Sequence, residues 1–330
     1  MKAYLVLLCL SITLFCCQKN QVEAPSKPSF IHEIPNAPYP WTSNTFELEE
    51  EDFTFAIISD LTGGERDGVY STAVNQLNRL DPTFVLSVGD LIEGGTEDTV
   101  QLIKEWNSFD DRTKSLNMPF FHLGGNHDLT NPTMRKIWNK RYGNTYYHFV
   151  YENVLFLMLD SEDYGDERMM EVYAARSEAM KIVRGEVEGK FEDTEYASMI
   201  ESKVGGMSDK QFQYFKNALD KNPDVKWTFL LMHKPVWMRE DGLGLGRLEE
   251  TLKGRNYSVI NGHFHSFSYR KRLGQDYTML GVTGGFQPEN DSMSFDHVTL
   301  VRMAEKPIVT HLKMEGILDE TGKVPVPVIE

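Results

Sequence analysis

Five short apolar segments, each followed by a polar loop, constrain the fold of this chain more than any other feature of its sequence. The loops carry Asp60, Asp90, Asn126, His233 and His263, and a glycine directly precedes three of these residues. Apolar runs of four to eight residues bounded by turn residues are typical of buried strands. A sequence of buried strands that end in polar loops predicts a sheet with one chemically active edge.

Helical periodicity between the strands predicts an α/β fold. Between the first two strands, apolar residues recur at Val69, Ala73, Val74, Leu77 and Leu80. Strand, helix and strand within forty residues predict a right-handed crossover and parallel pairing. Two further helices are expected at 97–116 and 208–219, and a hairpin over 146–160 with its turn at 152–153.

The residues at the strand ends form a set suited to metal binding. Ligands of open α/β sheets bind beyond the carboxyl ends of the strands, so we expect the set to converge on one rim. Two carboxylates, an amide oxygen and three imidazoles suit two divalent cations such as Mn, Fe or Zn, and a shared carboxylate would also hold a bridging water. Asp or Asn beside Gly is often only turn chemistry, but the ordered set favours a metal site. Its members are Asp60, Asp90, Asn126, His233, His263 and His265.

These motifs resemble those of the calcineurin-like metallophosphoesterase superfamily, and the resemblance spans about 53–267. It implies a four-layer α/β/β/α sandwich of two mixed sheets with a dinuclear metal site at its upper edge. It also implies hydrolysis of phosphomonoesters or phosphodiesters through a metal-bridging hydroxide. The matching segments are Asp60, Gly89-Asp90, Gly125-Asn126-His127-Asp128, His233 and Gly262-His263-Phe264-His265.

The resemblance also implies a role for each residue. Asp60 and His265 would hold the first metal and Asp90 would bridge both, while Asn126, His233 and His263 would complete the second. His127 would protonate the leaving alkoxide or stabilise the transition state, and Asp128 would orient His127. By contrast, His122, His148 and His297 stand apart from the motifs and are expected to be packed or surface histidines.

Three positions depart from the family pattern. Thr62 stands where the family's first motif has histidine, so the first metal is bound loosely, is completed by water, or is absent. Glu93 replaces the tyrosine of purple acid phosphatases, which excludes a ferric-tyrosinate enzyme but leaves an oxygen available. Glu93-Gly94-Gly95 lacks the phosphate-gripping arginine of Ser/Thr protein phosphatases, which disfavours protein dephosphorylation. A binding protein with a degenerate first metal site is therefore the alternative to a phosphoesterase.

An acidic insertion at about 161–207 interrupts the order of the motifs. It carries 12 acidic and 6 basic residues, and it forms either a lid near the metal edge or a solvated surface element. Outside it, the cations near motif loops that are available to bind phosphate are Arg239, Arg247 and Arg270.

The N-terminus predicts export. Residues 1–17 have the short basic start and apolar run of a signal peptide. Cys17, where the apolar run stops, resembles the lipidated residue of a bacterial lipoprotein; the alternative is a plain cleavable signal. We expect 18–45 to be a proline-rich tether, 46–320 the phosphoesterase domain and 321–330 a tail. The protein would be periplasmic or an outer-membrane lipoprotein, and would contact a membrane only through its lipid.

Net charge bears on the substrate. The formal charge is -15, which repels the phosphate backbone of nucleic acids. A small phosphoester is therefore the expected substrate, and a nuclease is the runner-up. The sequence does not indicate an oligomeric state.

Overall fold

The computed structural model describes residues 30–46 and 52–315. The signal peptide, Cys17, the first part of the tether (18–29) and the tail (321–330) lie outside these ranges. In the described ranges, no helix is both long and apolar enough to cross a lipid bilayer.

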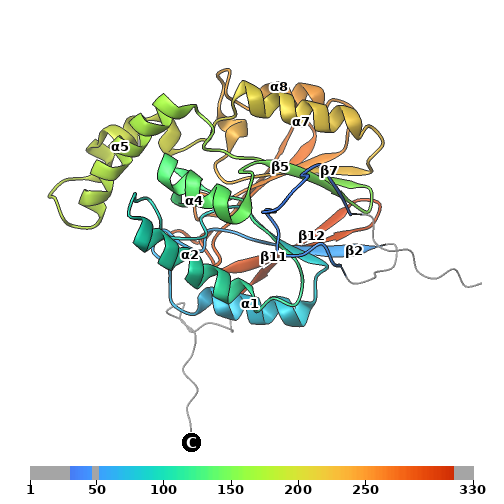
Figure 1. The fold of residues 1–330 in the computed structure, drawn as a ribbon, viewed down its shortest axis with the longest axis horizontal. Coiled ribbons are helices and arrows are strands. Elements are labelled where there is room, and N and C mark those ends of the chain that lie inside the picture. Colours follow the sequence, from blue (N-terminus) through green and yellow to red (C-terminus); the bar gives the residue numbers. More distant parts are fainter. Residues whose placement is uncertain (1–29, 47–51, 316–330) are drawn as a thin grey trace, which may run out of the picture.

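Two mixed sheets lie face to face at the centre of the molecule (Figure 1). The five-stranded sheet has the order β12-β11-β2-β3-β4, and the seven-stranded sheet has the order β1-β5-β6-β7-β8-β10-β9. The strands are β1 (Phe30–His32), β2 (Phe53–Ile58), β3 (Phe84–Ser87), β4 (Phe120–Phe121), β5 (Tyr147–Tyr151), β6 (Val154–Met158), β7 (Trp227–Met232), β8 (Tyr257–Asn261), β9 (Ser268–Arg272), β10 (Gln275–Met279), β11 (His297–Met303) and β12 (Pro307–Lys313).

Helices cover the outer face of each sheet. One core joins α1 (Val69–Leu80), α2 (Thr99–Thr113) and α4 (Pro132–Tyr142) to the five-stranded sheet. Another joins α7 (Asp209–Lys221) and α8 (Gly246–Thr251) to the seven-stranded sheet. The predicted four-layer α/β/β/α sandwich is therefore confirmed. The remaining helices are α3 (Asn126–Leu129), α5 (Asp166–Val183), α6 (Glu195–Ser198), η1 (Phe191–Asp193), η2 (Ile200–Ser202) and η3 (Val236–Met238).

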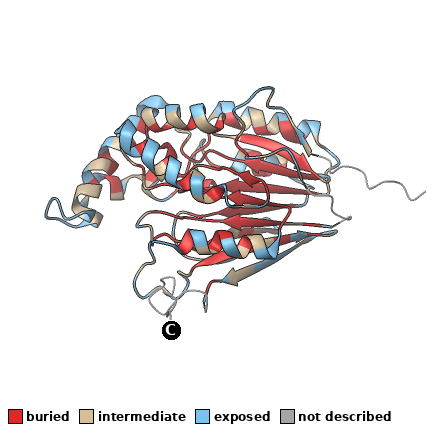
Figure 2. Ribbon diagram, turned by 60° about the horizontal axis from the view of Figure 1, so that its bottom comes forward, coloured by how far each residue is buried: buried red, intermediate tan, exposed pale blue. Residues whose placement is uncertain are grey.

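The alternation of side chains along β2 divides its residues between two cores. Phe53, Phe55 and Ile57 face the seven-stranded sheet, whereas Ala56 and Ile58 face the helices. Successive side chains of a strand point to opposite faces, so a strand with both faces covered is apolar throughout. Figure 2 shows the strands between the helical layers as almost continuously buried.

Local signals in the sequence correspond closely to these elements. Helix α1 has the predicted bounds, and the side chain of Ser208 caps α7 by accepting a hydrogen bond from the backbone N–H of Gln211. The hairpin turns at Glu152 and Asn153, whose φ angles are 44° and 61°. Two consecutive positive φ angles are what a tight two-residue hairpin requires.

The predicted tether is wrong from Phe30 onward. Strand β1 pairs antiparallel with β5, and Trp41 is 4% exposed in the core between the sheets. Prolines made this segment resemble a linker, but proline excludes only regular hydrogen bonding and not apolar packing. The backbone N–H of Thr42 also donates to the carbonyl of Phe120. Residues 30–46 are therefore part of the folded domain.

Parallel pairing brings the motif loops to one edge. Strands β2, β3 and β4 run parallel in one sheet, and β6, β7 and β8 run parallel in the other. Their carboxyl ends therefore carry the loops that begin at Ser59, Val88, His122, Leu159, His233 and Gly262.

Candidate metal centre

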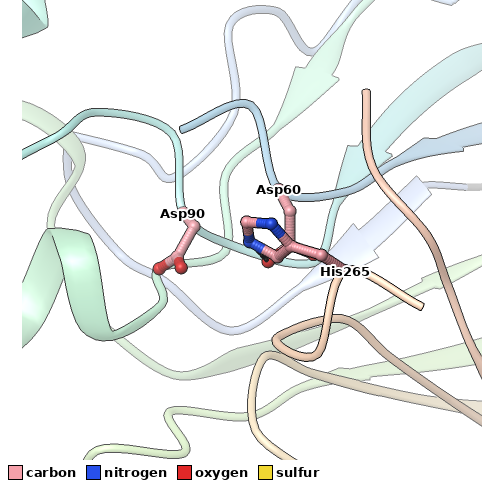
Figure 3. A group of neighbouring side chains, drawn as sticks. All are labelled: Asp60, Asp90 and His265. Atoms are coloured by element: carbon pink, nitrogen blue, oxygen red, sulfur yellow. Dashed lines mark ion pairs between the residues drawn. The ribbon is translucent and has the colours of Figure 1, made fainter. Parts of the chain in front are cut away.

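Asp60, Asp90 and His265 form the centre of the site. Each offers a ligand atom, and these atoms all lie within 4.8 Å of one another. Figure 3 shows the three side chains coming from separate segments and gathering in one place. Nε2 of His265 lies 3.3 Å from Oδ1 of Asp60. Two carboxylates and an imidazole in this arrangement are a donor set for a borderline divalent cation.

A second group of donors surrounds the other side of Asp90. Nε2 of His233 lies 3.1 Å from Oδ2 of Asp90 and 3.1 Å from Oδ1 of Asn126. The ring of His263 lies edge-on to that of His233, with centroids 5.2 Å apart. All six residues that the sequence marks as metal ligands therefore converge at the predicted edge.

The backbone at four of these residues is held in the left-handed region. The φ angles of Asp60, Asp90, His263 and His265 are 45°, 56°, 83° and 56°. Non-glycine residues adopt such angles at a cost of about 1 kcal/mol or more, and they cluster at functional sites. Their concentration at strand ends indicates that the fold accepts this strain to aim the side chains.

Glycines allow the loops to approach one another. A Cβ atom on Gly262 would lie 2.3 Å from Oδ2 of Asp60, and one on Gly125 would lie 2.3 Å from Oδ1 of Asp90. Both distances are far below contact distance, so any side chain at either position would displace a carboxylate.

Each imidazole in the set has its second ring nitrogen bonded to a backbone carbonyl. Nδ1 of His233 donates to the carbonyl of Val88 at 2.9 Å, and Nε2 of His263 donates to that of Ser202 at 3.0 Å. Nδ1 of His265 donates to the carbonyl of Phe286. Metal-binding histidines are typically oriented in this way, because the donated hydrogen bond leaves a lone pair on the other nitrogen.

The electrostatics of the centre also fit a cation. Burial acts to raise the pKa of Asp90, but His233 and His127 lie so close that the pKa falls well below its usual value. Burial likewise acts to lower the pKa of His233, yet Asp90 outweighs it and raises that pKa to about 9. Without a metal, the charge of Asp90 is therefore balanced by a protonated imidazole. A divalent cation would take over this role and release the proton.

Comparison with known proteins identifies the family. A model of the calcineurin-like phosphoesterase family matches residues 53–267. The chain belongs to the calcineurin-like phosphoesterase family. It is therefore a metal-dependent hydrolase of phosphoric esters.

Two solved structures of other proteins show the same fold, and a third gives a weaker match. A dimetal phosphatase from Danio rerio is 16% identical, with a TM-score of 0.57 over 79% of this chain and 96% of that one. A PhoD structure is 11% identical, with a TM-score of 0.51 over 79% and 68% of the two chains. Purple acid phosphatase PPD1 from yellow lupin is 13% identical, with a TM-score of 0.48 over 83% and 52%. No curated protein matches the chain.

Two further residues of this phosphoesterase that the sequence offered as ligands brace the loops. The hydroxyl of Thr62 bonds to the backbone carbonyls of Ile92 and Asp90, at 2.8 and 3.2 Å. Oε1 of Glu93 accepts hydrogen bonds from the backbone N–H groups of Gly64 and Glu65, at 2.9 and 2.7 Å. Both side chains thus connect the loop after β2 to the loop after β3.

The expected role of Asp128 in orienting His127 is wrong. Its carboxylate accepts hydrogen bonds from the backbone N–H groups of Gly125, Leu91 and Ile92, at 2.8, 3.0 and 3.2 Å. Nδ1 of His127 is held instead by the carbonyl of Glu93 at 2.7 Å. The carboxylate of Asp128 therefore holds the loop after β3 and the start of its own helix rather than the imidazole of His127.

His127 lies beside the metal centre and contacts an arginine that the sequence analysis missed. Its backbone N–H donates to Oδ1 of Asp90 at 2.9 Å, and its Nε2 accepts a hydrogen bond from Nη2 of Arg176 at 3.0 Å. Burial, followed by the charge of Arg176, lowers the pKa of His127, although Asp90 and Glu93 oppose this. Arg176 belongs to α5, inside the acidic insertion. The sequence held one signal that Arg176 is buried: its position in the helix lies on the same face as the buried Met169, Val172 and Ala179.

The three arginines that the sequence did single out are engaged elsewhere. Arg239 pairs with Asp241 and Glu201, and Arg247 pairs with Asp209. Arg270 lies over the ring of Trp237, with 4.9 Å between the guanidinium carbon and the ring centroid.

The insertion reaches the metal edge at two points. Figure 1 shows α5 projecting beside the sandwich. Besides Arg176, the insertion supplies the Ser202 carbonyl that fixes His263. Of the two alternatives from the sequence, a purely external surface element is excluded.

Proposed function

We propose that this protein hydrolyses small phosphoesters, as monoesters or diesters, with two divalent cations drawn from Mn, Fe or Zn. The observation that carries the proposal is the gathering of Asp60, Asp90 and His265 within 4.8 Å. The adjacent pair of His233 and Asn126, with Nε2 of His233 3.1 Å from Oδ2 of Asp90, supports a second cation.

The residues divide between the two cations around Asp90. Asp60 and His265 would hold the first, and Asn126, His233 and His263 the second, with Asp90 shared. Bound there, the cations would neutralise phosphoryl charge and activate water for in-line attack. Because Thr62 bonds to backbone carbonyls, the first cation would have no imidazole from that position. It is therefore the weaker of the two.

His127 would act on the substrate. Its Nδ1 is fixed by the Glu93 carbonyl, so Nε2, which accepts a hydrogen bond from Arg176 in this structure, is the ring atom that would approach a leaving-group oxygen once substrate engages Arg176. The hydrogen bond from the His127 backbone to Asp90 keeps the ring beside the metal centre. This placement supports the role implied by the family, which is assistance to the leaving group.

The site of action would be outside the cytoplasm. The apolar run of residues 1–17 and the position of Cys17 support export and lipidation, in the periplasm or at the outer membrane. The charge of -15 disfavours a nuclease.

Metal-restored turnover tests the proposal. The purified chain is stripped with chelator, supplied with Mn, Zn, Fe or Mg, and assayed on 4-nitrophenyl phosphate and bis(4-nitrophenyl) phosphate. We expect turnover with at least one metal, and about a 100-fold loss or more in Asp90→Asn, because both cations lose an anionic ligand. Asp81→Asn is the matched control, since Asp81 is exposed but has a similar left-handed φ of 50°.

Two outcomes would contradict the proposed phosphoesterase function. A folded protein that binds metal but hydrolyses neither ester would support the non-catalytic binding protein. Full activity in Asp90→Asn would remove Asp90 from the metal centre.

A further inference from the structure

Arg176 is a buried cation at the edge of the metal centre. The residue is 4% exposed, and its Nη2 donates to Nε2 of His127 at 3.0 Å. It reaches this position from α5 of the insertion, far in sequence from the motif loops.

The guanidinium has no carboxylate partner. In the part of the chain that the structure describes, its hydrogen bonds and ion pairs are limited to the one with His127. Neighbouring arginines differ: Arg135 pairs with Asp160, and both Arg168 and Arg239 pair with Glu201. Buried charges are normally paired, because an unpaired charge is costly to remove from water. An unpaired arginine here indicates that its partner is a ligand.

The space next to Arg176 adjoins the metal ligands. A Cβ atom on Gly63 would lie 3.6 Å from Nε2 of His127 and 3.5 Å from Nε2 of His265. The two imidazoles thus face the same small space, which glycine leaves open. On the other side, a Cβ on Gly95 would lie 2.4 Å from Nη1 of Arg176, so the guanidinium lies against the loop that follows Asp90.

We propose that Arg176 binds a non-bridging oxygen of the substrate's phosphoryl group and makes phosphomonoesters the preferred substrates. The inference rests on the proposed phosphoesterase function. A guanidinium presents a planar fork of N–H donors that matches phosphate oxygens. A monoester offers three non-bridging oxygens and up to two negative charges, whereas a diester offers two oxygens and one charge. A buried cation in addition to the metal ions therefore favours the monoester.

Three arginine variants test the assignment. Arg176→Gln removes the charge, and Arg176→Lys keeps it but loses the fork. Arg184→Gln is the matched control, because Arg184 caps the same helix and is exposed. Its Nη1 lies 3.9 Å from Oε1 of Glu186. Circular dichroism confirms folding. Calorimetry with inorganic phosphate measures affinity for the metal-loaded protein, and kcat/KM is measured for the 4-nitrophenyl monoester and diester.

We expect phosphate affinity to fall about 10- to 100-fold in Arg176→Gln, the range for a lost hydrogen bond to a charged group. The kcat/KM for the monoester should fall by a similar factor. The kcat/KM for the diester should fall less, by a factor under one third of that for the monoester. Arg176→Lys should show the same selectivity with a smaller loss. If Arg176→Gln does not fold, Arg176→Lys decides the question.

Phosphate affinity within twofold of the wild type, or an equal loss for both esters, would overturn the assignment. If the wild type hydrolyses neither ester, the proposed function fails, yet phosphate binding that depends on Arg176 would still support the binding role. Arg184→Gln should match the wild type throughout.

Discussion

His122 shows how one buried side chain affects the stability of the fold. It follows β4, close to the edge that carries the metal centre. It is 2% exposed, stacks on Tyr142 with ring centroids 4.1 Å apart, and donates from Nδ1 to the carbonyl of Pro40. Burial lowers the pKa of His122 to about 3. The imidazole is therefore neutral in the native state and takes up a proton only on unfolding.

The lowered pKa of His122 makes the free energy of unfolding depend on pH with a definite sign. The native pKa lies below the unfolded value of about 6.5, so the stabilisation is complete above pH 6.5 and is lost as the pH falls. His122→Phe should reduce the slope of unfolding free energy against pH between 6 and 4 by about 1 kcal/mol per pH unit. Urea unfolding in chelator measures this slope. His311→Phe is the comparison: burial lowers the pKa of His311 as well, but the side chain is only partly buried, so its removal should change the slope less. An unchanged slope in His122→Phe would show that His122 is protonated in the native state.

For single residues, the sequence identified the side chains that converge at the metal edge but not the residues that hold them there. Asp60, Asp90 and His265 lie two, three and four residues after the ends of β2, β3 and β8, so local pattern and parallel pairing place them together. Arg176 could not be placed, because its position depends on how a helix of the insertion packs against a distant loop. The contacts of Asp128 likewise depend on which backbone donors of another loop face it.

The insertion is fixed to the sandwich through Glu201. This side chain is 2% exposed and pairs with Arg168 at 2.7 Å and with Arg239 at 3.2 Å. The carbonyl of Glu201 accepts a hydrogen bond from Nζ of the buried Lys234 at 2.8 Å. The next carbonyl, that of Ser202, holds His263. Anchoring of the insertion and orientation of a metal ligand are thus adjacent in the chain.

Glu201→Gln should therefore weaken both the fold and the metal centre. We expect a loss of about 2 kcal/mol in unfolding free energy, because breaking a buried ion pair leaves a charge without its partner. Arg168 also pairs with Glu171, whose side chain is 54% exposed, so Glu171→Gln is a control on the same arginine. An exposed pair should change stability by less than about 0.5 kcal/mol. Denaturant unfolding measures both, and equal losses would show that burial of the pair has no effect.

Elements with strong periodicity were predictable, and those stabilised by distant contacts were not. Helices α1 and α7 carry their own apolar stripes, so the sequence predicts the bounds of α1 and places those of α7 to within two residues. Residues 30–46 have three prolines and little regular structure, and only their contacts with β5 and the core between the sheets make them part of the fold.

For the whole molecule, the alternation of strands and helices predicts an α/β fold, and the four-layer architecture is what the resemblance to the family implies. Export rests on the sequence alone. If Cys17 is lipidated as proposed, Cys17→Ser should move the protein from the membrane fraction to the soluble periplasmic fraction. Its metal-dependent activity should be unchanged, because every residue proposed for the metal centre lies at Asp60 or beyond. Fractionation with activity assays measures this. A variant that stays with the membrane would show that another feature anchors the protein.

The pairing of β1 determines the end of the sandwich at which the described chain begins. Phe30 pairs with Tyr151, next to the turn that leads into β6, and β6 runs parallel to β7 toward His233. The chain therefore enters the sandwich at the end opposite the metal centre. Only 12 residues separate Cys17 from Phe30, a reach of at most about 45 Å. A lipid at Cys17 would keep the molecule close to the bilayer and attached by the end away from its metal centre, which favours esters dissolved in the surrounding fluid over the headgroups beneath it.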